Sequence, residues 1–396
     1  MLSLILPSYE REMSNWVKDL ARRVERKTYP RLRSARRQTG DAVTKRPFKT
    51  ALVKQALDVF GPWSGVLWKD TSPERLFDMW PGKAVYWELT CVLKADWYII
   101  PQTLETDYTR DAIRRVAGRA ELTEKHVKNI TPPEDIPFSD YDVVITFDPI
   151  LSPPKLSRIL YAYYVQEHWD GIYAQSLRKP APNYDLFLDH MMAAPNRLRA
   201  LPQPVSFPYI HDHRLMRSLF GSSQQEAAWV DWRTLMTLAM KQLGEAWCPE
   251  AQAELYRLQD SLGIEIRCRT SNQAKTYGIS DSPQWGDAAH YFRELAECRY
   301  YVAVGRIAGA GQALADAAAL GCLCIGQKDK PYHRLLCHPL CLCKGMADMP
   351  RRLRALRENP ELQHEVLAFQ DAELLEHFHV RPLNHLQSAI QMKDPR

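Results

Sequence analysis

Long apolar runs are missing from this 396-residue sequence. A helix that crosses a bilayer needs roughly 18 consecutive apolar residues, and no stretch approaches that length. The first residues, MLSLILPSYERE, are apolar only as far as Pro7 and then become charged, unlike a secretory signal peptide. We therefore expect a cytoplasmic protein with no membrane-spanning helix.

Paired cysteine motifs are also missing. The nine cysteines are an odd number and follow no disulfide-framework spacing, which indicates reduced thiols. The densest group follows CxC and CxxxCxC spacing, whereas structural zinc sites usually show CxxC pairs, so we expect small buried thiols rather than a metal site. This group comprises Cys322, Cys324, Cys337, Cys341 and Cys343, with His333 and His338 nearby.

The sequence has no solenoid repeat and no low-complexity segment. With 45% hydrophobic and 25% charged residues, it has the composition of a globular protein, and its length suits roughly two domains.

The net charge of +5 is unevenly spread. Residues 22–49, RRVERKTYPRLRSARRQTGDAVTKRPFK, carry many cations and only Glu25 and Asp41 as anions. Such a block is either a solvated face or a peripheral contact with an anionic membrane or acidic glycan. No aromatic base-stacking pattern accompanies it, so we do not expect a nucleic-acid partner.

Strand-like apolar runs alternate with helical patterns, which is typical of βαβ units and a parallel sheet. In the first half the predicted strands are LSLIL near the start, 64–68, 83–89, 96–100, 141–147, 184–190 and 204–210, while 155–169 suits either a helix or a strand. In the second half we predict strands at 227–232, 264–270, 299–305 and 322–326, and helices at 233–243, 249–261, 288–298, near 349–359 and over 361–392.

Four prolines between 195 and 208 and the polar GSSQQE at 221–226 separate the two halves. We predict an α/β fold with two Rossmann-like domains facing across a cleft: 1–220 for the acceptor, 221–375 for the nucleotide-sugar donor, and 376–396 as a C-terminal tail or helix.

The segment VGRIAGAGQALADAAALGCLCIG, 304–326, reads as a strand, a glycine-rich loop, an alanine-rich helix and a strand. Free N–H groups at such a helix start favour a phosphate or carboxylate. A dinucleotide fingerprint would need a small residue at Leu314 and an acidic residue near Gln327 and Lys328. An NAD(P)-dependent oxidoreductase therefore stays an alternative, and a P-loop lacks its GK[ST].

The order of strand, GAGQALADAAALG and strand resembles the donor-binding region of GT-B glycosyltransferases, in which a helix N-terminus meets the donor phosphates. The resemblance implies sugar transfer without a bound metal or cofactor, from a nucleotide-sugar to a saccharide or lipid-linked acceptor. Where many retaining members have a glutamate at the helix start, this chain has Gln312 and Asp316. It is also similar to bacterial retaining β-Kdo transferases of surface polysaccharide and lipopolysaccharide assembly, which implies CMP-Kdo as donor and a carboxylate in the cleft.

Asp231 ends a predicted strand after the break and is the candidate nucleophile or ion-stabilising carboxylate; capping of the next helix is the competing interpretation. Glu167 and His168 are candidate acceptor bases, or surface residues of an aromatic helix. The candidate donor-binding residues are Arg233, Arg269, Ser271, Arg306, Gly309, Ala310, Gly311, Gln312, Tyr332 and His333, and those for the acceptor are His211 and His213. A phosphate-ligand binding protein without catalysis would use the same loop.

Overall fold

In the computed structural model, the described residues are 48–55, 84–100, 131–147 without 132, 156–165, 184–189, 204–206, 212–231, 259–267, 288–304 and 311–393, with the single positions 69, 234 and 257. The predicted strands LSLIL and 64–68, and the basic stretch up to Pro47, lie outside them.

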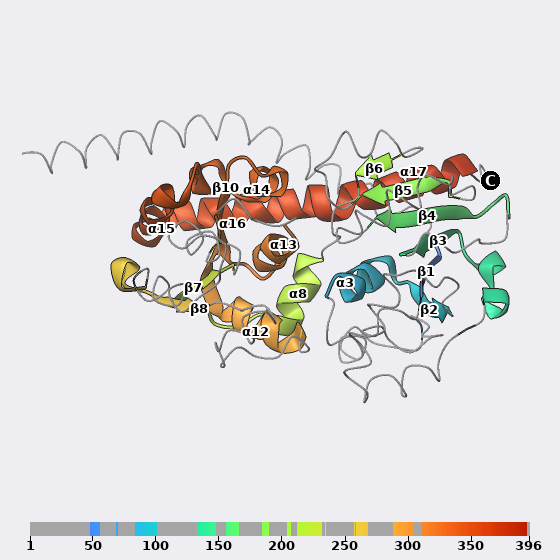
Figure 1. Cartoon of the computed structure of the whole chain (residues 1–396), viewed down its shortest axis with the longest axis horizontal. Coiled ribbons are helices and arrows are strands. Elements are labelled where there is room, and N and C mark those ends of the chain that lie inside the picture. Colours follow the sequence, from blue (N-terminus) through green and yellow to red (C-terminus); the bar gives the residue numbers. More distant parts are fainter. Residues whose placement is uncertain are drawn as a thin grey trace, which may run out of the picture. The chain divides into compact units, whose positions relative to one another are not determined.

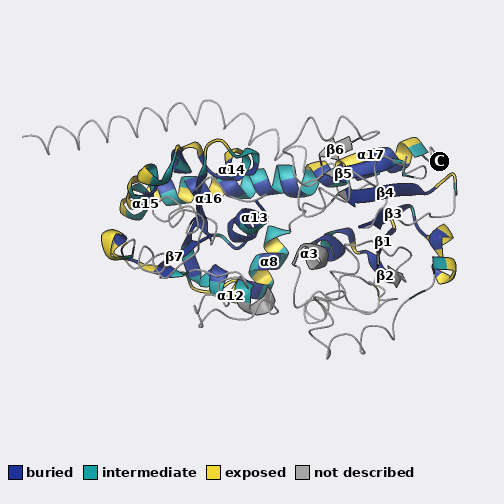
Figure 2. Cartoon of the chain, in the orientation of Figure 1, coloured by how far each residue is buried: buried dark blue, intermediate teal, exposed yellow. Residues whose placement is uncertain are grey.

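The first sheet has six parallel strands in the order β2-β1-β3-β4-β5-β6 (Figure 1). Its described core is buried on both faces, which explains why most of its strands read as continuous apolar runs. Figure 2 shows this burial in dark blue along β3 and β4. The strands are β1 Thr50–Gln55, β2 Asp96–Ile100, β3 Val143–Thr146, β4 Leu160–Val165, β5 Leu186–Asp189 and β6 Pro204–Ser206.

One predicted strand of this half is wrong. Residues 84–89 of the run at 83–89 belong to helix α3, Ala84–Leu93. Because β1 and β2 are adjacent and parallel, the chain between them needs a crossover, which α3 supplies. The helix stops at Lys94, whose φ of 49° is left-handed, and Ala95 N–H donates to Thr90 O at 3.1 Å.

The second sheet has five parallel strands in the order β11-β10-β9-β7-β8. Its strands are β7 Gln225–Val230, β8 Glu265–Arg267, β9 Cys298–Ala303, β10 Leu323–Gln327 and β11 Leu342–Cys343. Two parallel sheets with helical crossovers confirm the predicted α/β class.

The described helices after β6 include several that the sequence predicted, among them 288–297 and the long stretch near the C-terminus. They are α8 His213–Phe220, α12 Ala288–Glu297, α13 Gln312–Ala319, α14 Pro331–Leu336, α15 Met349–Glu358, α16 Pro360–Leu375, the π-helical segment η9 Glu376–Val380, and α17 Arg381–Lys393. Helices α8, α14 and α16 all contact α13.

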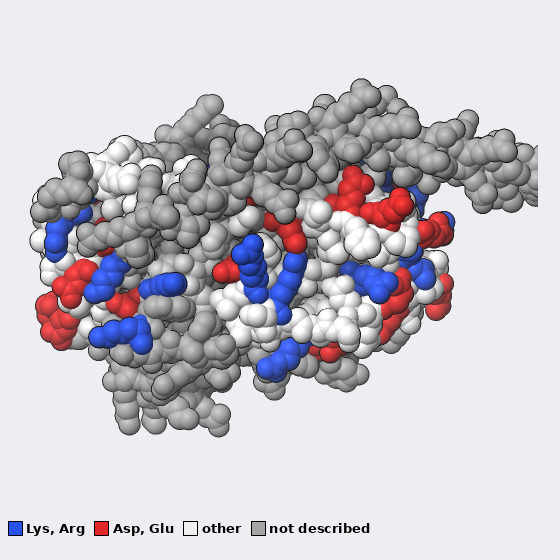
Figure 3. All heavy atoms as spheres, turned by 180° about the vertical axis from the view of Figure 1, so that it is seen from behind, with Lys and Arg blue, Asp and Glu red and all other residues white. Residues whose placement is uncertain are grey.

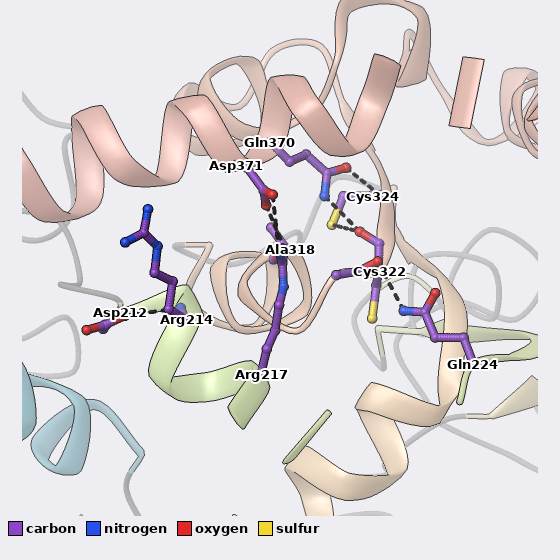
Figure 4. A network of polar contacts seen from close by, with 10 residues as sticks. Asp212, Arg214, Arg217, Gln224, Ala318, Cys322, Cys324, Gln370 and Asp371 are labelled. Carbon is purple, nitrogen blue, oxygen red and sulfur yellow. Dashed lines mark hydrogen bonds and ion pairs between the residues drawn. The ribbon is translucent and has the colours of Figure 1, made fainter. Parts of the chain in front are cut away.

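Gln370 of α16 binds the edge of β10 as a neighbouring strand would. Its Oε1 accepts from Cys324 N–H at 2.9 Å and its Nε2 donates to Cys322 O at 2.7 Å (Figure 4). Among the described residues, β11 pairs with β10 at Gly326 and Gln327 alone, so the amide supplies partners that the short edge strand does not reach. Gln370 is fully buried.

Arg217 of α8 holds three helices together. Its guanidinium donates to both carboxylate oxygens of Asp371 in α16, at 3.1 and 2.6 Å, and Nη2 also donates to Ala318 O in the last turn of α13 at 3.3 Å. A cation at that position also complements the negative end of the α13 dipole. Figure 4 shows the Arg217 side chain extending from α8 toward Asp371, with Ala318 close to its end.

The last helix packs on the first sheet. α17 contacts β4, and Lys393 Nζ lies 2.5 Å from Asp185 Oδ1, next to β5. Its buried residues Pro382, Leu386, Ala389 and Ile390 recur at helical spacing and form one apolar stripe. None of the described helices is both long and apolar enough to span a bilayer.

Candidate functional site at the carboxyl edge of the second sheet

The carboxyl ends of β7, β9 and β10 are neighbours, because these three strands are parallel and adjacent. In open α/β sheets this edge is where ligands bind. The glycine-rich segment chosen from sequence follows β9, whose last residue Ala303 and the next residue Val304 lie at this edge. Of its predicted residues, Arg306, Gly309 and Ala310 lie outside the described residues.

Asp231 follows the end of β7 and is buried, with 8% of its surface exposed. Its Oδ2 accepts a hydrogen bond from Tyr301 Oη at 2.9 Å, from the adjacent strand β9. Burial, followed by the nearby Asp231 carboxylate, raises the pKa of Tyr301 well above its ordinary value, so this phenol stays a donor at neutral pH. The carboxylate is thereby held at the end of β7, next to the adjacent strand β9.

Thr234 connects the end of β7 to the loop. Its N–H donates to Asp231 O at 2.9 Å, and its Oγ1 accepts from Val304 N–H at 3.0 Å. Val304 is the last described residue before the loop, so Asp231 and the loop entrance share one buried hydrogen-bond chain. Neither Thr234 nor Tyr301 was predicted from sequence, because nothing in RYYVAVG tells which tyrosine faces the carboxylate.

Gly311 is the N-cap of α13 and has a left-handed φ of 98°. An ideal Cβ at this position would lie 2.6 Å from the Cβ and Cγ atoms of Tyr332. Both the dihedral angle and the contact require glycine. Ala315 N–H donates to Gly311 O at 2.9 Å, and earlier N–H groups of an α-helix have no partner within the helix. Gln312, the first residue of α13, is half-buried.

Tyr332 and His333 lie in α14 and are 2% and 1% exposed. His333 Nδ1 accepts from Gln327 N–H at 2.8 Å, which ties α14 to the end of β10. Burial, with Lys330 as a smaller cause, lowers the pKa of His333 to about 4, so the ring is neutral at pH 7. An ideal Cβ at Gly326 would lie 2.9 Å from the same Nδ1. Contact of either ring with a nucleotide base stays a prediction.

Gln327 adds an unused acceptor at the same edge. Its Nε2 donates to Lys344 O at 3.1 Å, while its buried Oε1 has no hydrogen-bond partner among the described residues. The sequence drew attention to Gln327 only because an acidic residue was missing there.

The predicted acceptor residue His213 is the first residue of α8, whose N-cap Asp212 accepts from the N–H groups of Arg214 and Leu215 at 3.1 Å. Burial lowers the pKa of His213, and Arg217 acts in the same direction while Asp371 opposes it. α8 contacts α13, so His213 belongs to the helical layer of the second sheet.

Five further predicted site residues lie outside the described residues: Glu167, His168, Arg233, Arg269 and Ser271; so does the second acceptor candidate, His211. Arg267, two positions before Arg269, forms ion pairs with Glu265 and Glu297 at 2.7 Å on the edge strand β8.

The cysteine group is buried around β10 and α14. Cys322, Cys324, Cys337, Cys341 and Cys343 are free thiols, and burial raises the pKa of each. Within the described part of the chain, no three His, Cys, Asp or Glu side chains are grouped so that they could hold a metal ion. These thiols pack in the interior as small apolar groups.

No protein-family model and no curated protein sequence matches this chain. Among solved structures, it is similar to the pneumococcal O-GlcNAc transferase GtfA in complex with UDP and GlcNAc, with 12% identity and a TM-score of 0.38 over 63% of this chain and 56% of GtfA. The chain thus spans little more than half of GtfA. HepE of Anabaena in complex with UDP is 10% identical, with a TM-score of 0.43 over 88% of this chain and 100% of HepE. Sucrose-phosphate synthase from Thermosynechococcus elongatus is 10% identical, with a TM-score of 0.45 over 88% of this chain and 100% of the synthase.

Proposed function

We propose that this protein is a glycosyltransferase that moves a sugar from a nucleotide-sugar to a saccharide or lipid-linked acceptor. The observation that carries the proposal is that Asp231 and the entrance to the glycine-rich loop lie at neighbouring strand ends, joined through Tyr301 and Thr234. A carboxylate beside a phosphate-binding turn suits a reaction with a cationic transition state and an anionic leaving group.

In the proposed reaction, the bond between the anomeric carbon and the donor phosphate oxygen breaks, and the acceptor hydroxyl oxygen bonds to that carbon. The first N–H groups of α13 after Gly311 bind the departing phosphate. Asp231 stabilises the oxocarbenium-like centre or attacks it, and Glu167 or His168 takes the hydroxyl proton. Arg233, Arg269, Ser271, Arg306, Gly309, Ala310 and Gln312 are the proposed donor contacts, with His211 and His213 toward the acceptor.

We propose CMP-Kdo as the donor and bacterial surface polysaccharide as the product, on the strength of the sequence resemblance. A thermal-shift panel of CMP, UDP, GDP and dTDP tests the donor class. A preference for CMP supports the Kdo donor, and a preference for UDP removes it while leaving sugar transfer in place.

Catalysis is tested with Asp231→Asn, which keeps the Tyr301 hydrogen bond but removes the charge. We expect nucleotide affinity within about twofold of wild type and a loss of transfer of about 10²-fold or more, measured as nucleotide release from the donor. If the variant binds and wild type releases nothing with any donor, the protein is a nucleotide-binding protein. A change in nicotinamide absorbance with any substrate would instead favour the oxidoreductase.

A further inference from the structure

Tyr332 contacts two segments that are far apart from it in the sequence. The first is Gly311, whose backbone lies so close that no Cβ would fit between it and the Tyr332 side chain. Gly311 has no side chain with which to cap α13, and its left-handed backbone is unfavourable for other residues. The backbone orientation at the start of α13 therefore depends on the side chains that pack against Gly311.

The second is Phe378, which is fully buried. The two ring centroids are 5.6 Å apart at an interplanar angle of 56°. Phe378 belongs to η9, the π-helical segment between α16 and α17. Short π-helical segments are rare and occur often at functional sites, because the added residue re-aims the side chains of that turn.

We propose that Tyr332 is a positioning residue for donor binding. Its ring, packed against Phe378, holds Gly311 in the left-handed conformation and so sets the direction of the first N–H groups of α13. This inference rests on the proposed function, since it assigns to Tyr332 the geometry of the turn that binds the donor phosphate.

Rigid aromatic rings suit this role. A buried tyrosine has few rotatable bonds, and its contacts with Gly311 and Phe378 restrict it here, so its position affects that of the glycine backbone. Hydrogen bonds to a phosphate demand well-placed donors, and a displacement of about 1 Å in these N–H groups is enough to weaken donor binding markedly. Loss of the ring removes the support without touching the phosphate contacts themselves.

Four variants test the proposal: Tyr332→Leu, Tyr332→Phe, Phe378→Leu and the control Leu356→Ala. Leu356 is a buried residue of α15, so its truncation disturbs the core on a different helix from that of Tyr332. Affinity for UDP and for CMP is measured by calorimetry, and donor KM and kcat by nucleotide release. We expect Tyr332→Leu and Phe378→Leu to raise Kd and KM about tenfold with kcat within about twofold. Tyr332→Phe keeps the ring, so its Kd and KM should stay near those of the wild type.

Hydrogen exchange of the ligand-free variants separates this inference from the proposed function. The amide of Ala315, which donates to Gly311 O, should exchange faster in Tyr332→Leu and Phe378→Leu than in Leu356→Ala, even if neither nucleotide binds the wild type. Unchanged exchange at this amide in folded Tyr332→Leu overturns the positioning role. Failure of wild type to bind UDP and CMP, with the exchange difference present, counts against the donor site and leaves the support of Gly311 standing.

Discussion

At the scale of single residues, Gln370 makes the sharpest stability prediction. Replacing it with alanine leaves Cys324 N–H and Cys322 C=O buried without their present partner. We expect a loss of about 2–4 kcal/mol in the free energy of unfolding, from urea denaturation followed by circular dichroism.

Gln363→Ala is the matched control for this change. Gln363 lies in the same helix but is half-buried and makes one side-chain bond, to Leu356 O at 2.8 Å. Its loss should cost less than about 1 kcal/mol. Equal losses in the two variants would show that the hydrogen bonds of Gln370 to β10 contribute nothing specific to the free energy of unfolding.

His333 makes stability depend on pH. Its folded pKa of about 4 lies below the ordinary histidine value of 6.5, so the unfolded chain takes up a proton first as pH falls. This contribution to stability is complete above about pH 6.5 and is lost as pH falls toward 4, by roughly 3 kcal/mol in all. Protonation also ends the acceptor role of Nδ1 toward Gln327 N–H.

Urea midpoints between pH 7 and 4.5 measure this effect for wild type and for His333→Gln, which cannot titrate. We expect a steeper fall for wild type than for the variant, after the common acid sensitivity of the carboxylates is subtracted. Parallel curves would mean that another group carries the pH dependence.

At the scale of elements, Arg217 joins α8, α13 and α16, and Arg217→Met keeps its length while removing the ion pair with Asp371 and the bond to Ala318 O. Because both partners are about one third exposed, we expect a modest loss of about 1–2 kcal/mol, smaller in high salt. Arg217→Lys should recover only part, since lysine cannot pair bidentately. A loss independent of salt would point to packing of the aliphatic stem instead.

The elements also show what the sequence could reveal. β3 and β9 were predicted because parallel strands buried on both sides are continuous apolar runs. β1 was missed because Thr50 and Lys54 break the run TALVKQ, although both are nearly fully buried. α3 was taken for a strand because its short apolar run is ambiguous in period, and only the parallel pairing of its neighbours decides.

The candidate site, too, could be predicted from the sequence only in part. Gly311 and Asp231 were found because a turn residue and a strand-end carboxylate are visible in a linear sequence. The support behind them was not, since the contacts of Tyr332 with Gly311 and Phe378 join residues 21 and 46 positions apart. Pro331 at the start of α14 was the one local signal that KPYHRLL is a helix rather than a loop.

At the scale of the whole molecule, charge is uneven along the chain but mixed over the surface drawn in Figure 3, where lysine and arginine of the described residues lie next to aspartate and glutamate. The concentrated cations are those of residues 22–49. We therefore expect co-sedimentation with anionic phosphatidylserine vesicles and not with neutral ones, each basic residue adding about 1 kcal/mol near the surface.

Replacing Arg33, Arg36 and Arg37 with glutamine should weaken vesicle binding at least tenfold and leave the thermal midpoint unchanged. Replacing Arg351 and Arg354, exposed residues of α15, is the control for nonspecific charge loss. Equal binding of all three proteins would assign the basic stretch to a solvated face.

The return of α17 to β4 has a consequence for synthesis. Strands β1 to β6 emerge from the ribosome long before residues 381–393. The first sheet therefore lacks the helix that packs on β4 until the whole second sheet has been synthesised. Until then the surface that receives Leu386 and Ile390 faces water, and nascent chains stalled before residue 381 would be the ones that chaperones retain.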